Sequence, residues 1–142
     1  MSVDENFQKI KNFLELNPAS QKLSALLPEN TEISIKIGEG LECVYFCHNN
    51  KPFVERRSSK NEVLTLNFLP EGIDLLTSSR PEEATDIVSD FFKIYLSGLV
   101  KIKVHGSLEL FQSQLATVLS KLPSKDDLKM MTQLILKKFS QK

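Results

Sequence analysis

Residues 31–68 read TEISIKIGEGLECVYFCHNNKPFVERRSSKNEVLTLNF, and apolar residues recur at every second position along much of this stretch. Such alternation is typical of β-strands with one buried face. The polar residues that interrupt it favour turns. Because these turns are short, we expect four strands in an antiparallel meander. The four strands are predicted at residues 33–37, 41–48, 53–57 and 62–68.

A fifth strand is predicted at residues 99–106, LVKIKVHG, where valine and isoleucine alternate with lysine and histidine. The remaining segments place apolar residues three or four positions apart, which predicts amphipathic helices. Strands and helices are largely segregated along the chain, so the predicted fold class is α+β. We expect a single layer of about five mostly antiparallel strands, covered on one face by helices. The helices are predicted at residues 4–16, 19–27, from 70 onward, 81–97, 107–122 and 124–142.

Capping signals flank the helix predicted at residues 81–97. Ser79 and Glu82 have the spacing of a capping box, in which each side chain accepts a hydrogen bond from the other residue's backbone N–H. Gly98 is suited to the C-cap, because glycine adopts a left-handed conformation without strain. We therefore expect this helix to begin after Ser79 and to end at Gly98.

The length of 142 residues fits one domain. Neither an internal repeat nor a long linker divides the chain, so we predict a single domain over residues 1–142. Within it we expect an N-terminal helical extension (1–28), a core (31–122) and a C-terminal amphipathic helix (124–142). Since this last helix follows a proline break, we expect it to act as a lid or portal.

Charge and composition exclude several classes of protein. Lys and Arg number 18 and Asp and Glu number 18, so the formal net charge is zero at pH 7. A general nucleic-acid binder needs surplus cations, so we expect no nucleic-acid partner. No apolar run approaches the roughly 20 residues that cross a bilayer. The start of the chain lacks the pattern of a signal peptide, and with only two cysteines this favours a cytoplasmic location.

Cys43, Cys47 and His48 are the residues that most resemble metal ligands. If residues 41–48 form a strand, the two cysteines lie roughly 13 Å apart along it. That separation is too large for a disulfide or for two ligands of one zinc ion. We therefore predict two buried, structural cysteines.

The other chemistry-bearing residues show no catalytic arrangement. His48 and His105 are the two histidines, and neither lies at a motif spacing from a Ser or Cys nucleophile. Glu82, Asp86 and Asp90 share one helix face, which we interpret as solvated. The sequence also lacks a glycine-rich phosphate loop. We expect no enzyme, no cofactor and no metal, since an enzyme would need His105 or a carboxylate to face a cavity with a perturbed pKa.

The strongest positive signal is apolar. Six predicted amphipathic helices must pack against one small sheet, and the chain has nine phenylalanines and no tryptophan. The simplest interpretation is an ordinary core. The alternative is that the helices pack over the sheet with a gap, which leaves an apolar cavity for a lipid chain.

Short motifs favour the second interpretation. They are LTL at 64–66 in a strand, IDLLT at 73–77 in a short helix, and GLVKIKVHG at 98–106 in the last strand. Together with the strands predicted at 33–37 and 41–46, they resemble the sterol carrier protein type 2 family. The resemblance covers about residues 31–122. Ser78 stands where this family usually has a glycine.

This resemblance implies a non-enzymatic domain whose sheet and helices enclose an apolar tunnel for a fatty acyl, sterol or isoprenoid-like lipid. The ligand-binding residues would then lie on the faces that converge between sheet and helices. The candidates are Phe46, Leu64, Leu66, Phe68, Leu76, Phe91, Phe92, Tyr95, Ile102, Leu108, Phe111 and Leu115.

A second hypothesis is a protein-interaction or dimerisation module with a closed pocket. Its C-terminal amphipathic helix would bind a partner, or a second copy of the chain, through Leu134, Ile135 and Phe139. A lipid carrier is expected to touch membranes transiently, whereas the interaction module is expected to form a homodimer.

Overall fold

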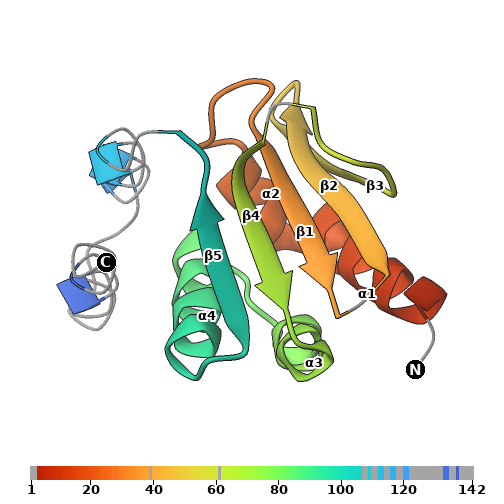
Figure 1. The fold of residues 1–142 in the computed structure, drawn as a ribbon. Helices are drawn as coiled ribbons and strands as arrows, with labels where there is room; N and C mark the ends of the chain where they lie inside the picture. Colours follow the sequence, from red (N-terminus) through yellow and green to blue (C-terminus); the bar gives the residue numbers. More distant parts are fainter. Residues whose placement is uncertain are drawn as a thin grey trace.

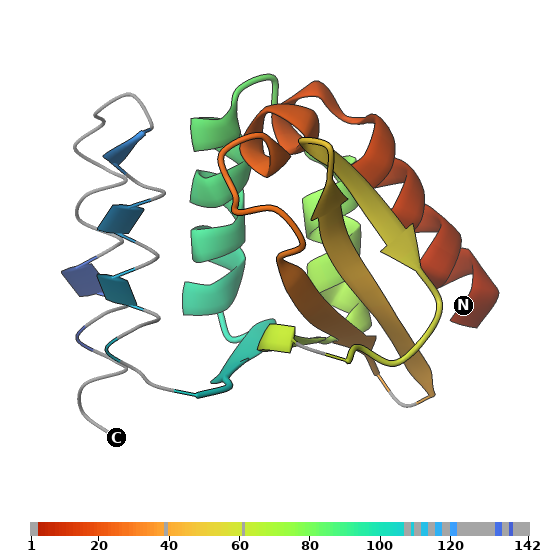
Figure 2. The same ribbon diagram turned by 90° about the horizontal axis from the view of Figure 1, so that it is seen from above.

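The computed structural model describes residues 3–38, 40–60 and 62–106, and ten further positions (109, 112, 113, 116, 117, 120, 121, 133, 134 and 137). Its elements are α1 (Val3–Leu16), α2 (Pro18–Ser24), β1 (Glu32–Ile37), β2 (Leu41–His48), β3 (Lys51–Glu55), β4 (Glu62–Phe68), α3 (Pro70–Ser78), α4 (Ala84–Leu96) and β5 (Val100–Val104). These helices pack on one side of the five-stranded sheet, so the predicted α+β class is confirmed (Figure 1 and Figure 2).

The strands follow the spatial order β3-β2-β1-β4-β5. β1 pairs with β4 in parallel, and the other neighbouring strands pair antiparallel. The predicted meander is therefore wrong at the fourth strand, because β4 lies on the far side of β1 rather than beside β3. The connection at residues 56–61 is long enough for this: six extended residues reach roughly 20 Å, while three strand spacings require about 14 Å.

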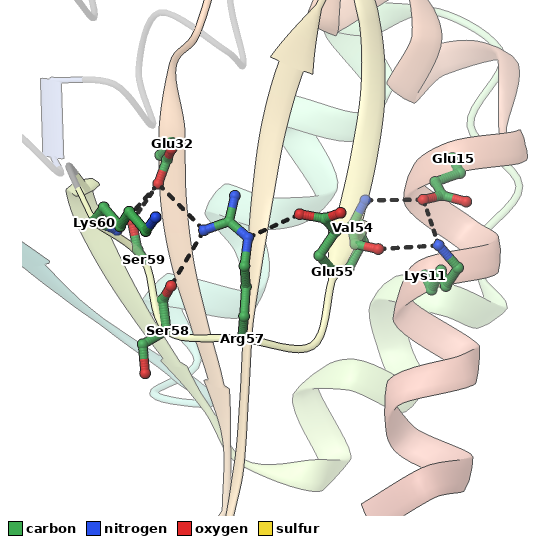
Figure 3. Close-up of polar contacts among 9 residues, drawn as sticks. All are labelled: Lys11, Glu15, Glu32, Val54, Glu55, Arg57, Ser58, Ser59 and Lys60. Atoms are coloured by element: carbon green, nitrogen blue, oxygen red, sulfur yellow. Dashed lines mark hydrogen bonds and ion pairs between the residues drawn. The ribbon is translucent and has the colours of Figure 1, made fainter.

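This connection crosses the sheet face that the helices leave uncovered (Figure 3). Arg57 donates a hydrogen bond of 2.8 Å to the Glu55 carboxylate, and its guanidinium carbon lies 5.4 Å from the ring centroid of Phe46. Ser59 donates one of 2.7 Å to the Glu32 carboxylate. These contacts hold the connection against β1 and β2, where Ser34 is buried although it faces away from the helices.

α1 closes the outer edge of β3. Glu15 accepts a hydrogen bond of 2.9 Å from the Val54 N–H, and Lys11 donates one of 3.0 Å to the Val54 carbonyl (Figure 3). The Lys11 ammonium lies 2.7 Å from the Glu15 carboxylate. Both backbone groups of Val54 are therefore satisfied as they would be by a further strand, which protects this edge from pairing with another chain.

The predicted N-terminal extension is part of the core. Ile10 and Phe13 of α1 and Ala19 of α2 belong to the same buried cluster as the sheet residues. α2 begins at Pro18, one residue before the predicted start, and ends at Ser24. The Asn17 side chain accepts hydrogen bonds from the backbone N–H groups of Ala19 and Ser20, and Pro18 needs no such partner.

The turn between β2 and β3 consists of Asn49 and Asn50. Their φ angles are 53° and 63°. Positive φ at both central residues defines the hairpin turn that matches the twist of the flanking strands, and asparagine tolerates it well.

The start of α4 differs from the prediction. Its capping box consists of Glu83 and Asp86, not of Ser79 and Glu82. The Ser79 hydroxyl instead donates a hydrogen bond of 3.0 Å to the Leu76 carbonyl, so Ser79 completes the end of α3.

The end of α4 is as predicted. Gly98 has φ of 83° and donates a backbone hydrogen bond of 3.0 Å to the Tyr95 carbonyl. The Leu99 N–H bonds the Ile94 carbonyl at 3.2 Å. This pair of bonds is the Schellman arrangement, which ends the helix and directs the chain into β5.

Candidate functional site

The helix-facing side of the sheet has a tightly filled half. Here α1 packs on β2 and β3, α2 packs on β3, and α3 packs beside α1 and against β4. Every apolar sheet residue that faces the helices in this half is buried, and so are four of the helix residues above it, whereas Phe7 and Leu14 of α1 are half-buried. The sheet residues are Ile35, Ile37, Leu41, Cys43, Tyr45, Cys47 and Val54, and the helix residues are Ile10, Phe13, Ile73 and Leu76.

The other half of the same face is covered less completely. Apart from Phe68 and Val100, which are buried, its sheet side chains are half-buried although they face the helices. The register places Ile33, Leu64 and Val104 side by side across three strands, and Leu66 beside Ile102. Val88 and Phe91 on α4 are also half-buried and pack against the core cluster. These seven residues are called the apolar patch below.

Four of the predicted ligand-binding residues belong to the apolar patch: Leu64, Leu66, Phe91 and Ile102. Four others are buried in the core beside it: Phe68, Leu76, Phe92 and Tyr95. The ring centroids of Phe68 and Phe91 are 6.1 Å apart in an edge-on arrangement, so the patch is continuous with the core.

The predicted position of Phe46 is wrong. Tyr45 and Cys47 face the helices, so Phe46 points to the opposite side of the sheet, where its ring centroid lies 5.5 Å from that of Phe53. The cause is strand geometry, since successive side chains alternate between faces.

Several other predicted residues belong to the segment that follows β5. Leu108, Phe111 and Leu115 lie outside the described residues, as do Ile135 and Phe139. Leu134 is described and 50% exposed.

Sequence reasoning missed Ile33, Val88 and Val104. Ile33 and Val104 flank Leu64 in the register. Val104 lies two positions after Ile102, so the sequence already indicated that the two share one face of the strand. Val88 lies three residues before Phe91, which is the spacing of neighbours on a helix surface.

The thiols and the phenol of this interior are unsuited to nucleophilic chemistry at neutral pH. Burial raises the pKa of the Cys43 thiol to about 12, and burial also raises the pKa of Cys47. The pKa of Tyr45 is raised by burial and by the neighbouring Cys47, whose sulfur lies 3.7 Å from the phenol oxygen. Both cysteines are free and buried, as predicted from the strand geometry.

The histidines lie away from the apolar patch. His105 Nε2 is 2.6 Å from Thr65 Oγ1 and 3.9 Å from a Glu62 carboxylate oxygen, on the sheet face opposite the helices. His48 Nδ1 lies 3.3 Å from a Glu29 carboxylate oxygen in an exposed pair. Within the described ranges, no three His, Cys, Asp or Glu residues gather as metal ligands would.

A groove of about 670 Å³ lies elsewhere on the surface, between α1 and the end of α3. Phe13 and Leu16 form its apolar part, and Lys9, Asp74 and Arg80 contribute charges. Lys9 and Asp74 pair with each other at 2.8 Å. The groove is separate from the apolar patch. In the part of the chain that is described, none of the helices has both the length and the apolar character needed to cross a bilayer.

No protein-family model matches the chain, and no curated protein matches it. Solved structures are similar to it at low sequence identity. The UbiJ-SCP2 ubiquinone synthesis protein is 13% identical with a TM-score of 0.48, and the match covers 82% of this chain and 91% of that chain.

The sterol carrier protein domain 2 of Helicoverpa armigera is 15% identical with a TM-score of 0.42, covering 87% of this chain and 92% of that one. A conserved hypothetical protein of Thermus thermophilus, described as possibly a sterol carrier protein, is 10% identical with a TM-score of 0.42, covering 92% and 86%. These similar structures carry the name of the family that the motifs of this chain resemble.

Proposed function

We propose that this chain is a non-enzymatic lipid-binding protein that holds an apolar chain against the apolar patch, between sheet and helices. The observation that carries the proposal is the unequal burial of one sheet face. Leu64, Leu66 and Ile102 remain half-buried, while residues such as Cys43 and Val54 on the same face are fully buried. The apolar side chains on this sheet face are only partly covered by the helices of the chain. An apolar ligand would bury the remaining exposed area, so the face suits such a ligand.

The energetics support binding without a specific polar contact. Each buried methylene contributes about 0.8 kcal/mol, so a chain of about 15 methylenes offers roughly 12 kcal/mol before costs. Ordering and association remove several kcal/mol or more, which leaves affinity in the micromolar range. Selectivity would then follow the length and shape of the site, and we expect it to be loose among fatty acyl, sterol and isoprenoid-like lipids.

The segment after β5 is proposed as the remaining wall. Lys121 Nζ lies 3.5 Å from the Leu26 carbonyl just after α2, so the chain at residue 121 lies close to the helical layer. Its described helical residues Glu109, Ser113, Ala116, Thr117 and Ser120 are exposed. In the sequence, the remaining candidates alternate with these residues at helical spacing, so our proposal includes them. They are Leu108, Phe111 and Leu115.

Native mass spectrometry of gently purified protein, followed by titration with a fluorescent fatty acid, tests the proposal. We expect co-purifying lipid or micromolar uptake. Leu64→Gln places an amide in the patch and should abolish uptake, whereas Leu75→Gln, at a leucine of α3 that is 52% exposed, should not. Uniformly bare protein that takes up no probe would refute lipid binding.

Gel filtration addresses the alternative of dimerisation through the C-terminal helix. A chain truncated after Pro123 that loses a dimer but keeps lipid uptake would assign residues 124–142 to assembly. A monomer whose uptake changes on truncation would support the lid or portal that we propose for that helix. A single domain over residues 1–142 and a cytoplasmic location stay predictions.

A further inference from the structure

The two edges of the sheet differ in how their backbone groups are satisfied. At the β3 edge, the N–H and C=O of Val54 are bonded by Glu15 and Lys11 of α1. At the other edge, β5 has β4 as its only strand neighbour in the described sheet. Among the described residues, no hydrogen bond from another element reaches the outer side of β5.

The pairing of β5 with β4 shows which groups point outward. The His105 N–H bonds the Val63 carbonyl at 3.1 Å, and the Leu69 N–H bonds the Leu99 carbonyl at 3.0 Å. In an antiparallel pair, residues that bond the neighbour alternate with residues that do not. The N–H and C=O groups of the remaining β5 residues therefore point away from the sheet. These residues are Val100, Ile102 and Val104.

The side chains beside this edge are positively charged on one face. Lys101 and Lys103 are exposed on the face opposite the helices, and among the described residues neither forms an ion pair. Lys36 of β1 lies in the same row as Lys101, with Asn67 of β4 between them. An incoming strand would thus meet cations on one face and the half-buried Ile102 and Val104 on the other.

We propose that the outer edge of β5 binds an extended acidic segment of a partner protein by strand addition. Its backbone would bond the outward groups of Ile102 and Val104, which supplies affinity. Acidic residues at every second position would lie beside Lys101 and Lys103, which supplies specificity. The apolar residues between them would lie on the helix side of the sheet.

A second copy of this chain fits the edge poorly. Antiparallel pairing of two β5 strands about Ile102 would place Lys101 of one copy opposite Lys103 of the other. Like charges directly opposite each other destabilise a strand pair. The charge pattern therefore selects a partner of opposite charge over self-association.

Fluorescence polarisation of the full-length protein with a labelled peptide of alternating glutamate and valine tests this assignment. We expect saturable binding that weakens as salt is added. The matched control peptide has lysine in place of glutamate and should not bind. The double variant K101E/K103E should bind the glutamate peptide about tenfold more weakly or worse, because two attractions become repulsions. It should bind the lysine peptide instead.

Amide hydrogen exchange locates the contact. On adding the glutamate peptide, the amides of Ile102 and Val104 should exchange more slowly, while those of Lys101 and Lys103, already bonded to β4, should not change. Slow exchange at Ile102 and Val104 in the free protein would show that the chain covers its own edge and would overturn the proposal. Absence of peptide binding would show that these lysines serve only to keep the edge unpaired. Binding indifferent to K101E/K103E would show that the lysines do not select the partner, and either result would overturn the proposal. The lysines face away from the apolar patch, so K101E/K103E should leave lipid uptake unchanged.

Discussion

The helix-facing side of the sheet is one continuous surface with two different halves. Under α1 and α3, Cys43, Val54 and Tyr45 are buried and meet Ile10 and Ile73 from above. Toward β4 and β5, the sheet side chains of the apolar patch face the same way and are only half-buried, although Phe68 and Val100 at one end of these strands are buried. Both halves read as the same alternating pattern in the sequence, so alternation alone does not determine how well a face is covered.

The difference separates stability from binding. A fully buried side chain makes many contacts, and removing it leaves a cavity. A half-buried side chain is already partly exposed to solvent. Its removal therefore lowers the free energy of unfolding less, but it removes a contact that a bound ligand would make. Substitutions in the filled half should therefore mainly lower stability, and substitutions in the apolar patch should mainly lower ligand affinity.

The largest effect is expected at Ile73 of α3, which is fully buried in the filled half. Ile73→Ala should lower the free energy of unfolding by about 2–5 kcal/mol, through lost burial and a residual cavity. Urea denaturation measures this change. Leu75→Ala on the exposed side of the same helix should stay within about 0.5 kcal/mol. Equal effects at the two positions would contradict the description of this half as filled.

The edge of the filled half should give a smaller effect. Glu15→Ala leaves the Val54 N–H without its acceptor and should cost about 1–3 kcal/mol. Glu15→Gln keeps an oxygen that can accept the same hydrogen bond and should cost less. Denaturant midpoints of the two variants check the order. If Ala and Gln were equivalent, α1 would not be closing this edge through that bond.

A weaker effect on stability is expected in the apolar patch. Leu66→Ala should lower the free energy of unfolding by only about 1 kcal/mol, because the side chain is already half-exposed. The same change should reduce fatty-acid affinity, as titration with a fluorescent lipid would show. A large loss of stability with unchanged lipid uptake would place Leu66 in the core instead.

Local pattern was sufficient to predict strand positions but not strand order. β2 and β4 have the predicted bounds because alternation and turn residues are properties of neighbours in the chain. The place of β4 beside β1 depends on residues 56–61 reaching across two strands, which no local pattern encodes. The contacts that hold this crossing, such as Arg57 with Glu55 and Phe46, are set by the folded sheet rather than by sequence spacing.

The candidate site was predictable in part for the same reason. Leu64, Leu66 and Ile102 follow from alternation, and they do form part of the patch. Phe46 was misplaced because β2 carries apolar residues on both faces, so its periodicity did not tell which side meets the helices. Ile33 could have been included only with the parallel register known, since its neighbour Leu64 is far along the chain.

The smallest effect is expected at the thiols of the filled half. Burial raises the pKa of Cys43 to about 12, and the thiolate is the reactive form, so the folded protein should not react with a disulfide reagent at pH 8. Reaction should instead follow unfolding, and its rate in mild urea should track the open population. Mass spectrometry of the labelled protein would show whether Cys43 and Cys47 react together. We expect that they do, because a filled half that unfolds cooperatively exposes both thiols in the same event. Labelling of either cysteine in the native state would mean that this half opens on its own, and the contrast between a closed and an open half would fail.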